Sequence, residues 1–164
     1  KMQDIIQLQR ATIDEHIRTE DAKDWQAVAS TFIPGEAAYF DVMPLATRFQ
    51  GMSGVLDFYQ TFATALPDFQ ITVTGEYDTP GCSIREVTIN GTHLGEYGGV
   101  PASGKRVTFE LAGFFLFGTE ADAGKVLCER VYFDNEILMR QMRGEADAPT
   151  GIGLAALAGA APKA

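Results

Sequence analysis

Glu129 is a candidate general base, because of the strand in which it lies. The run 125–134 is expected to form a strand, and because side chains alternate between its two faces, Glu129, Val131 and Phe133 share one face. An apolar cavity raises the pKa of a carboxyl group by desolvation and makes such a group a usable base near neutral pH. The competing interpretation is a glutamate at a strand edge, exposed or paired with an arginine.

His93 is the second candidate for catalysis. The run 83–94 places five residues on one face by the same alternation, namely Arg85, Val87, Ile89, Gly91 and His93. An imidazole facing a cavity can act as acid, as base or as donor to an oxyanion. The alternative is a histidine that hydrogen-bonds the glycine-rich loop that follows it. His16 lies on a predicted helix beside Ile17, where we expect a surface position.

Arg85 is expensive to bury alone, so an inward-pointing Arg85 needs a partner. Glu129 and Glu110 are the candidates in the neighbouring runs. A pair with Glu129 would be a structural ion pair and would leave a poor base. An unpaired Arg85 would instead bind an anionic group of a substrate.

Tyr39, Asp41 and Tyr59 are weaker candidates for substrate binding. Tyr39 and Asp41 lie in a short β-like run, and Tyr59 is expected mainly to pack in the core with its hydroxyl at a rim. Two histidines 77 positions apart, with no spaced carboxylates beside them, predict no metal site and no metal cofactor.

The composition narrows the classes of partner. The chain has 164 residues, 46% of them hydrophobic, which suits one domain with a real core. A net charge of −9 argues against binding nucleic acid or an anionic membrane surface. Two cysteines form no disulfide framework, and no apolar run reaches the ~20 residues of a membrane span. These features predict a cytoplasmic protein.

Helices are expected before strands. Apolar residues at helical spacing predict a helix over 2–19, a second from an Asp21 cap to Pro34, and a third from a Ser53 cap to about Leu66. Residues 37–42 predict a short strand and 43–50 a loop. Longer strands are expected over 69–77, 83–94, 106–117 and 125–134, followed by a helix capped by Asp134. Residues 1–143 would form the domain, and the Ala/Gly/Pro-rich 144–164 a tail.

Segregated helices on sequentially paired strands predict an α+β fold with a mostly antiparallel sheet. The run 106–117 is apolar on both faces, which predicts that it is covered twice, and Gly113 in its middle suggests a bend. A bent sheet wrapped around a helix encloses a cavity. The loop 95–105, rich in glycine, would be a mobile hairpin or lid over it.

Four segments carry a family resemblance: PDF at 67–69, GTHLGEYGGVPASGKRV at 91–107, GKVLCERVYFD at 124–134 and LMRQM at 138–142. Together with the order of the helices, they resemble the SnoaL-like polyketide cyclases of the nuclear-transport-factor-2-like superfamily. The resemblance covers about residues 2–143. It implies a cone-shaped α+β barrel in which three helices and a strongly curved sheet enclose a pocket.

The resemblance also implies cofactor-independent ring closure by aldol chemistry, and a homodimer. In such cyclases an aspartate acts as acid and base three residues before the aspartate that ends the last strand. That position is Val131 here, since the strand-ending aspartate is Asp134. The expected catalyst is therefore missing from its usual place, and a second polar position of the cyclases falls near Gly113.

Two functions remain open at the level of sequence. The first is a cofactor-independent enzyme that cyclises, isomerises, dehydrates or hydrolyses a hydrophobic oxygenated small molecule, with Glu129 as base and His93 as its polar partner. In that reading Arg85 or Tyr39 orients a substrate oxygen. The second is a non-catalytic module that binds a small molecule. A purely structural dimerisation domain would require a filled pocket.

Overall fold

The computed structural model describes residues 1–145, which fold as four α-helices and six strands with two short 3-10 turns between them. The helices are α1 (Met2–Asp21), α2 (Trp25–Ala29), α3 (Gly51–Ala65) and α4 (Asn135–Arg143). The strands are β1 (Tyr39–Val42), β2 (Thr47–Gln50), β3 (Gln70–Thr79), β4 (Cys82–Thr92), β5 (Arg106–Phe117) and β6 (Val126–Phe133). The predicted α+β class is confirmed. All but Gly144 and Glu145 of the predicted tail lies outside the described residues.

Helix caps explain where the helices begin. Asp24, not Asp21, caps α2, because its Oδ1 accepts a hydrogen bond from the amide of Ala27 at 3.1 Å. Asp21 instead accepts from the amide of Ile71 and so ties the end of α1 to β3. The predicted Ser53 cap is also wrong, since α3 already begins at Gly51. Asp134 caps α4 as predicted, through the amide of Ile137.

The sheet is mixed, with the strand order β2-β1-β6-β5-β4-β3. Strands β3 to β6 pair antiparallel in sequence, as short connections require, and β1 pairs parallel with β6. Strand β2 lies within the predicted loop 43–50. The sequence pattern did not predict this strand, because Thr47, Arg48 and Gln50 are exposed at the edge of the sheet and give no apolar alternation.

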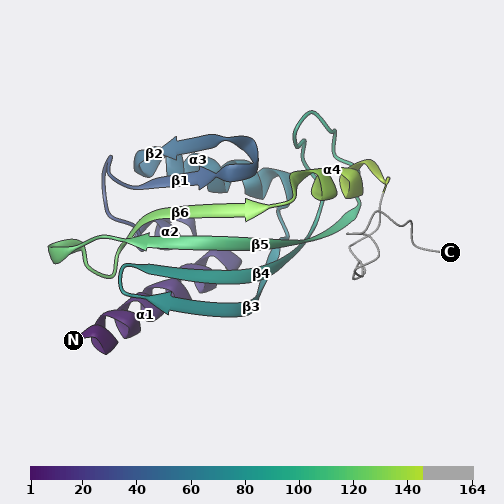
Figure 1. Cartoon of the computed structure of the whole chain (residues 1–164). Helices are drawn as coiled ribbons and strands as arrows, with labels where there is room; N and C mark the ends of the chain where they lie inside the picture. The colour runs from purple at the N-terminus through teal and green to yellow at the C-terminus, as the bar shows by residue number, and fades with distance from the viewer. Residues whose placement is uncertain (146–164) are drawn as a thin grey trace.

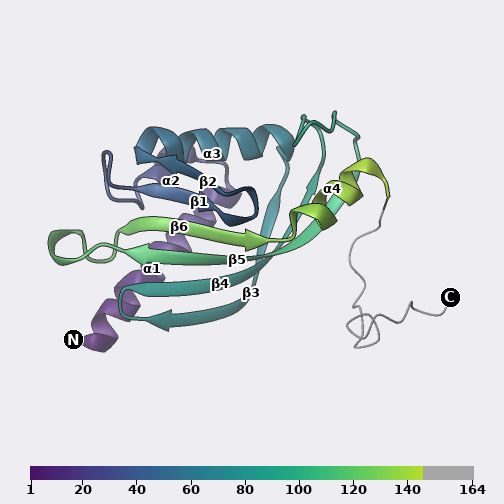
Figure 2. The same cartoon turned by 45° about the horizontal axis from the view of Figure 1, so that its top comes forward.

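The helices α1, α2 and α3 cover one face of the sheet, as Figure 1 shows. The strands β3, β4 and β5 curve where they approach α4, which follows β6 at the end of the sheet far from the N terminus (Figure 2). The sheet stays open, with β2 and β3 at its edges. No helix among residues 1–145 is long and apolar enough to cross a membrane.

Strand β5 is apolar on both sides, as its sequence predicted. Phe109 and Phe115 are buried on the inner face. On the outer face Phe114 packs against Tyr132, with ring centroids 5.6 Å apart. The inner face of β4, β5 and β6 and the helices above it form the walls of the candidate site.

Candidate functional site

A cavity lies between the helices and the inner face of the sheet. The space open to the centre of a water molecule is about 110 Å³, and the walls are mainly aromatic and aliphatic. Its charged side chains are three: Glu20 from α1, Arg85 from β4 and Glu129 from β6. Apolar lining comes from every surrounding element, including Ile17, Phe40, Phe58, Phe62, Val87, Ile89, Phe109, Leu111, Phe115, Val131 and Phe133.

Glu129 is held at the wall by two neighbours through the same oxygen. Its Oε2 accepts a hydrogen bond from the Tyr59 hydroxyl at 2.6 Å and lies 3.1 Å from His16 Nε2. Its other oxygen, Oε1, makes no hydrogen bond with any described residue and is not sealed off from the cavity. The carboxylate is therefore oriented from behind, with one oxygen available to a bound molecule.

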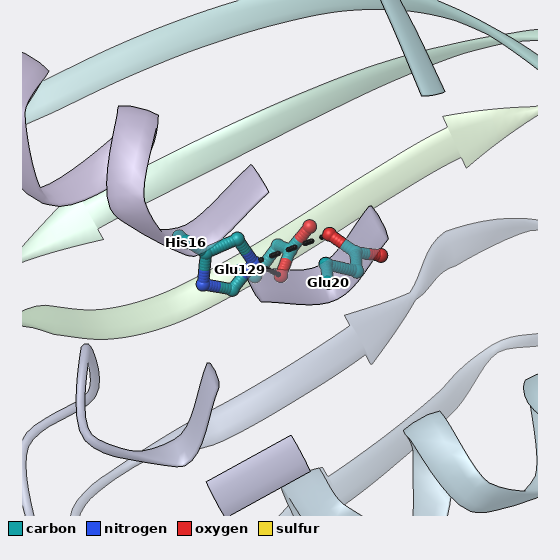
Figure 3. Close-up of side chains that lie close together, drawn as sticks. All are labelled: His16, Glu20 and Glu129. Carbon is teal, nitrogen blue, oxygen red and sulfur yellow. Dashed lines mark ion pairs between the residues drawn. The ribbon is translucent and has the colours of Figure 1, made fainter. Parts of the chain in front are cut away.

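His16 carries both ring protons in this arrangement. The Thr31 hydroxyl donates to the carbonyl of Val28 at 2.6 Å, so it accepts from His16 Nδ1 at 2.9 Å. Nε2 points at the carboxylates of Glu129 and Glu20 (Figure 3). Burial lowers the pKa of His16, but the two carboxylates outweigh it and raise that pKa to about 10. His16 is thus an imidazolium at neutral pH.

Glu20 is the second carboxyl group of this cluster. Its Oε2 lies 3.5 Å from His16 Nε2, and Figure 3 shows both glutamates converging on the same end of the ring. Burial, the largest effect, and the nearby charge of Glu129 raise the pKa of Glu20 despite the opposing pull of His16. We refer to His16, Glu20, Tyr59 and Glu129 as the buried cluster.

The expectation of a surface position for His16 is wrong, because its side chain is fully buried. Met2, at the start of the helix, is apolar but largely exposed. The buried face of the helix includes Gln9, Ile13, His16 and Glu20, at intervals of three to four residues. That spacing of His16 and Glu20 was the available signal, and it is weak because such pairs are common on solvated helices.

The buried cluster also meets the geometric requirement for a metal site. His16, Glu20 and Glu129 each offer a ligand atom, and these atoms lie within 4.8 Å of one another. The prediction of no metal site assumed that no carboxylate is spaced beside either histidine, and that premise is wrong, because Glu20 follows His16 by one helical turn. A cation would, however, have to displace the proton from His16 Nε2, since a protonated ring nitrogen cannot be a ligand.

Arg85 lies elsewhere on the cavity wall and meets neither predicted partner. Its Nη1 donates to Asp78 Oδ1 at 2.9 Å and to the carbonyl of Ile84. Glu129 belongs to the buried cluster. Glu110 is exposed and accepts from the hydroxyl of Thr88. The prediction that one of these glutamates pairs with Arg85 is therefore wrong, and Glu110 does not line the cavity.

His93 does not line the cavity either, although it is fully buried. Strand β4 ends at Thr92, and the amide of His93 donates to the carbonyl of Lys105 at 2.9 Å, whereas the amide of Leu94 donates to the carbonyl of Ala65 at the end of α3 at 3.0 Å. His93 Nδ1 pairs with the Ser103 hydroxyl at 2.9 Å, inside its own loop. The structure thus matches the alternative stated for His93, and it does not bring this histidine to Glu129.

Tyr39 and Asp41 point away from the cavity. Because side chains alternate along β1, Phe40 and Val42 face the cavity, whereas Tyr39 and Asp41 face outward. Asp41 forms ion pairs with Arg48 at 2.7 Å and Arg130 at 3.2 Å. The expectation that Tyr39 and Asp41 contact a substrate is therefore wrong for this cavity, because the phase of so short a strand cannot be fixed without its neighbours.

The loop after β4 touches the cavity through Tyr97, whose hydroxyl donates to Asn135 Oδ1 at 2.7 Å. Gly95 is required where this loop crosses α3, because a Cβ there would lie 2.1 Å from the carbonyl oxygen of Thr64. The loop is thus anchored to both α3 and α4.

Residues 10–142 match the family model of the SnoaL-like polyketide cyclases. The chain belongs to this family. No curated protein sequence matches it. The resemblance noted in the sequence is therefore confirmed over the described domain.

Solved structures of the same fold support the architecture. A SnoaL-like candidate polyketide cyclase from Jannaschia sp. CCS1 superposes with a TM-score of 0.76 at 18% identity, covering 87% of this chain and 95% of that one. AclR from Streptomyces galilaeus, a candidate hydroxylase, gives 0.71 at 18% identity, covering 85% and 98%. IdmH from Streptomyces antibioticus, a candidate polyketide cyclase, gives 0.68 at 18% identity, covering 82% and 98%.

Val131, the position at which the resemblance leads us to expect an aspartate, lies in the cavity wall. Glu129 lies on the same face of β6, two residues earlier. The carboxylate on this face of the strand is thus two residues from the expected position.

Proposed function

We propose that this chain is a cofactor-independent enzyme that moves a proton on a hydrophobic, oxygenated small molecule. The class of reaction is cyclisation, isomerisation, dehydration or hydrolysis. One observation carries the proposal: Glu129 offers an unbonded oxygen to an apolar cavity while Tyr59 and His16 fix the other oxygen. A base held in this way needs little reorganisation when it takes a proton.

The two glutamates of the buried cluster suit different halves of such a reaction. Glu129 accepts hydrogen bonds from Tyr59 and His16 on one oxygen and presents the other to the cavity, which suits a proton acceptor. Glu20 lines the same cavity with a raised pKa, which favours the protonated, proton-donating form. Environments that separate two carboxyl groups in this sense assign one as base and the other as acid.

The other neighbours have positioning roles in this scheme. His16 and Tyr59 contact Glu129 from behind, and Tyr59 does not line the cavity. When Glu129 takes a proton, the cluster keeps the positive charge of His16, which is then left to stabilise negative charge on the reacting molecule. His93, the earlier candidate for the polar partner, has no part in the proposal.

The proposal is tested by hydrogen exchange on a model ketone. 2-Tetralone has acidic hydrogens next to its carbonyl group, and its fused rings suit aromatic walls. We expect the protein to accelerate exchange of these hydrogens in deuterated water, and Glu129→Gln to lower the rate by about 100-fold or more. Glu110→Gln on the outer surface is the matched control and should leave the rate unchanged. Equal rates for Glu129→Gln and the parent chain would refute the assignment of the base.

Val131 favours a second candidate function, a non-catalytic binding module, because the cavity persists where the family's aspartate is absent. In that case 2-tetralone or a similar molecule would raise the melting temperature without any acceleration of exchange. The same pair of measurements therefore separates the two functions.

A further inference from the structure

Arg85 is the one charged side chain of the cavity wall with donors left over. It is 1% exposed, and both Nε and Nη2 are buried without a hydrogen-bond partner among the described residues. Leaving charged donors of this kind unsatisfied costs several times more than an ordinary hydrogen bond contributes. Such groups are rare in native proteins and call for an explanation.

The geometry of the guanidinium shows which side is free. Nη1 is fixed by Asp78 Oδ1 and by the carbonyl of Ile84, both at 2.9 Å. Nε and Nη2 form the opposite, side-on edge, where two parallel N–H groups match the two oxygens of a carboxylate. Arg85 is therefore hydrogen-bonded on one edge, and on the edge that suits a planar anion its donors are buried without partners among the described residues.

Asp78 does not account for the presence of Arg85. Arg10 pairs with Asp78 Oδ2 at 2.6 Å, closer than Arg85 does. Burial raises the pKa of Asp78, but hydrogen bonds from Ser83, Arg10 and Arg85 outweigh it and lower that pKa. This aspartate would keep a cation and a hydroxyl if Arg85 were absent.

Glu76 is the other carboxylate near the open edge. Its Oε1 lies 4.0 Å from Arg85 Nε, beyond hydrogen-bond distance, and its side chain is half exposed at the edge strand β3. It offsets part of the charge of Arg85 without occupying the donors.

The floor of the cavity leaves room for a ligand at this point. Arg85, Gly113 and Val131 lie opposite one another on β4, β5 and β6, and all three line the cavity. Glycine adds no side chain between the arginine and the valine. A Cβ at Gly113 would meet its nearest atoms, in Phe115 and Leu111, at 3.6 and 3.7 Å. That spacing is ordinary contact, so the missing side chain is not forced by crowding.

We propose that the side-on edge of Arg85 is an anion subsite and that the physiological ligand is a hydrophobic carboxylic acid. This inference rests on the proposed function only in taking the same cavity as the ligand site. The carboxylate would be bound at Arg85, two strands away from Glu129 and one inward-facing row along the sheet. The ligand would thus be anchored at one wall and deprotonated at another.

The test compares two probes of equal shape, 2-naphthoate and the neutral 2-naphthamide, by calorimetric titration of the full chain. We expect the carboxylate to bind at least about tenfold more tightly. Arg85→Met should abolish this preference and should still fold, because Arg10 remains beside Asp78. Arg85→Lys keeps the charge but loses the fork, so it should retain only part of the preference. Glu76→Gln should increase the preference for the carboxylate over the amide.

Three outcomes would overturn the inference. They are equal affinities for the two probes, a carboxylate preference that survives Arg85→Met, and no binding of either probe at millimolar concentration. Each is independent of the proposed function, because acceleration of hydrogen exchange on 2-tetralone by Glu129 needs no anion subsite. Conversely, a charge preference without any exchange would support the subsite and reject the enzyme.

Discussion

The cavity has two charged regions that are organised in opposite ways. In the buried cluster, His16, Tyr59, Glu20 and Glu129 satisfy one another within 3.5 Å. At Arg85, one nitrogen is bonded by the protein and two are left without partners. Both regions contribute charged side chains to the lining of the same apolar cavity.

The difference indicates two kinds of polar group in a binding site. Groups that hold one another are positioned before any ligand arrives, which suits a catalytic base. Groups that lack a partner are completed by the ligand, which suits recognition. Stability should therefore depend mainly on the buried cluster, and selectivity mainly on Arg85.

The largest expected effect is the loss of stability from His16→Leu. This change leaves two buried carboxyl groups facing hydrocarbon without their cation, and we expect a loss of about 3–5 kcal/mol in the free energy of unfolding. Urea denaturation at pH 7 measures it. Arg85→Met is the matched comparison and should cost only about 1–2 kcal/mol, since Asp78 keeps Arg10.

A double variant sharpens this result. Adding Glu129→Gln to His16→Leu removes the carboxylate that the first change leaves buried without its cation. The double variant should therefore be more stable than the sum of the two single losses predicts. Strict additivity would mean that His16 and Glu129 do not interact in the folded protein, in conflict with their 3.1 Å separation.

The second prediction concerns the pH dependence of stability. The folded pKa of His16, about 10, lies above its ordinary value of 6.5, so the folded state keeps a proton that the unfolded chain releases. Stability is then complete below about pH 6.5 and is lost as pH rises toward 10. The raised pKa of Glu20 acts in the same direction, beginning above its ordinary value. Between pH 7 and 8 we expect a loss of about 1 kcal/mol.

Urea titrations at pH 7, 7.5 and 8 measure this slope below the range in which thiols and phenols ionise. His16→Gln cannot gain this proton, so the part of the slope that comes from His16 should be lost and only the contribution of Glu20 should remain. A parent chain with no slope would show that His16 is neutral and that the buried cluster is held by hydrogen bonds alone.

The fold was accessible from sequence because it depends on repeated local patterns. Alternation predicted the strands around Ile71 and Val87, and a continuous apolar run predicted the strand around Phe115. Asp134 caps its helix as predicted. The face shared by Glu129, Val131 and Phe133 follows from the same rule and is the face that lines the cavity. The edge strand β2 was missed because edge strands need no apolar pattern.

Only part of the site could be predicted from the sequence, because its residues come from elements that are far apart in the chain. Alternation identified the face of Glu129 and of Arg85, but nothing in the sequence says that α1 crosses above them. Hence His16 was assigned to the surface, and His93 was placed beside Glu129 although its strand ends first. The partners of Arg85 were missed for a related reason: the irregularity between Val73 and Gly75 changes which residues of β3 face inward.

The third prediction tests the open floor beside Arg85. Gly113→Ala adds one methyl group that meets its neighbours at ordinary contact distance, so stability should change by no more than about 1 kcal/mol. The methyl group would project between Arg85 and Val131 and should weaken binding of 2-naphthoate several-fold. Thermal unfolding and calorimetric titration give the two numbers. An unchanged affinity would place the bound carboxylate away from this row.

The smallest effect is expected at His93, the histidine that the sequence favoured. His93→Gln should weaken the bond to Ser103 and cost about 1 kcal/mol of stability, since Nε2 has no partner to lose. Because His93 lies outside the cavity, affinity for 2-naphthoate and exchange on 2-tetralone should both stay within about twofold of the parent chain. A tenfold fall in either would mean that the cavity extends past the end of β4 in solution.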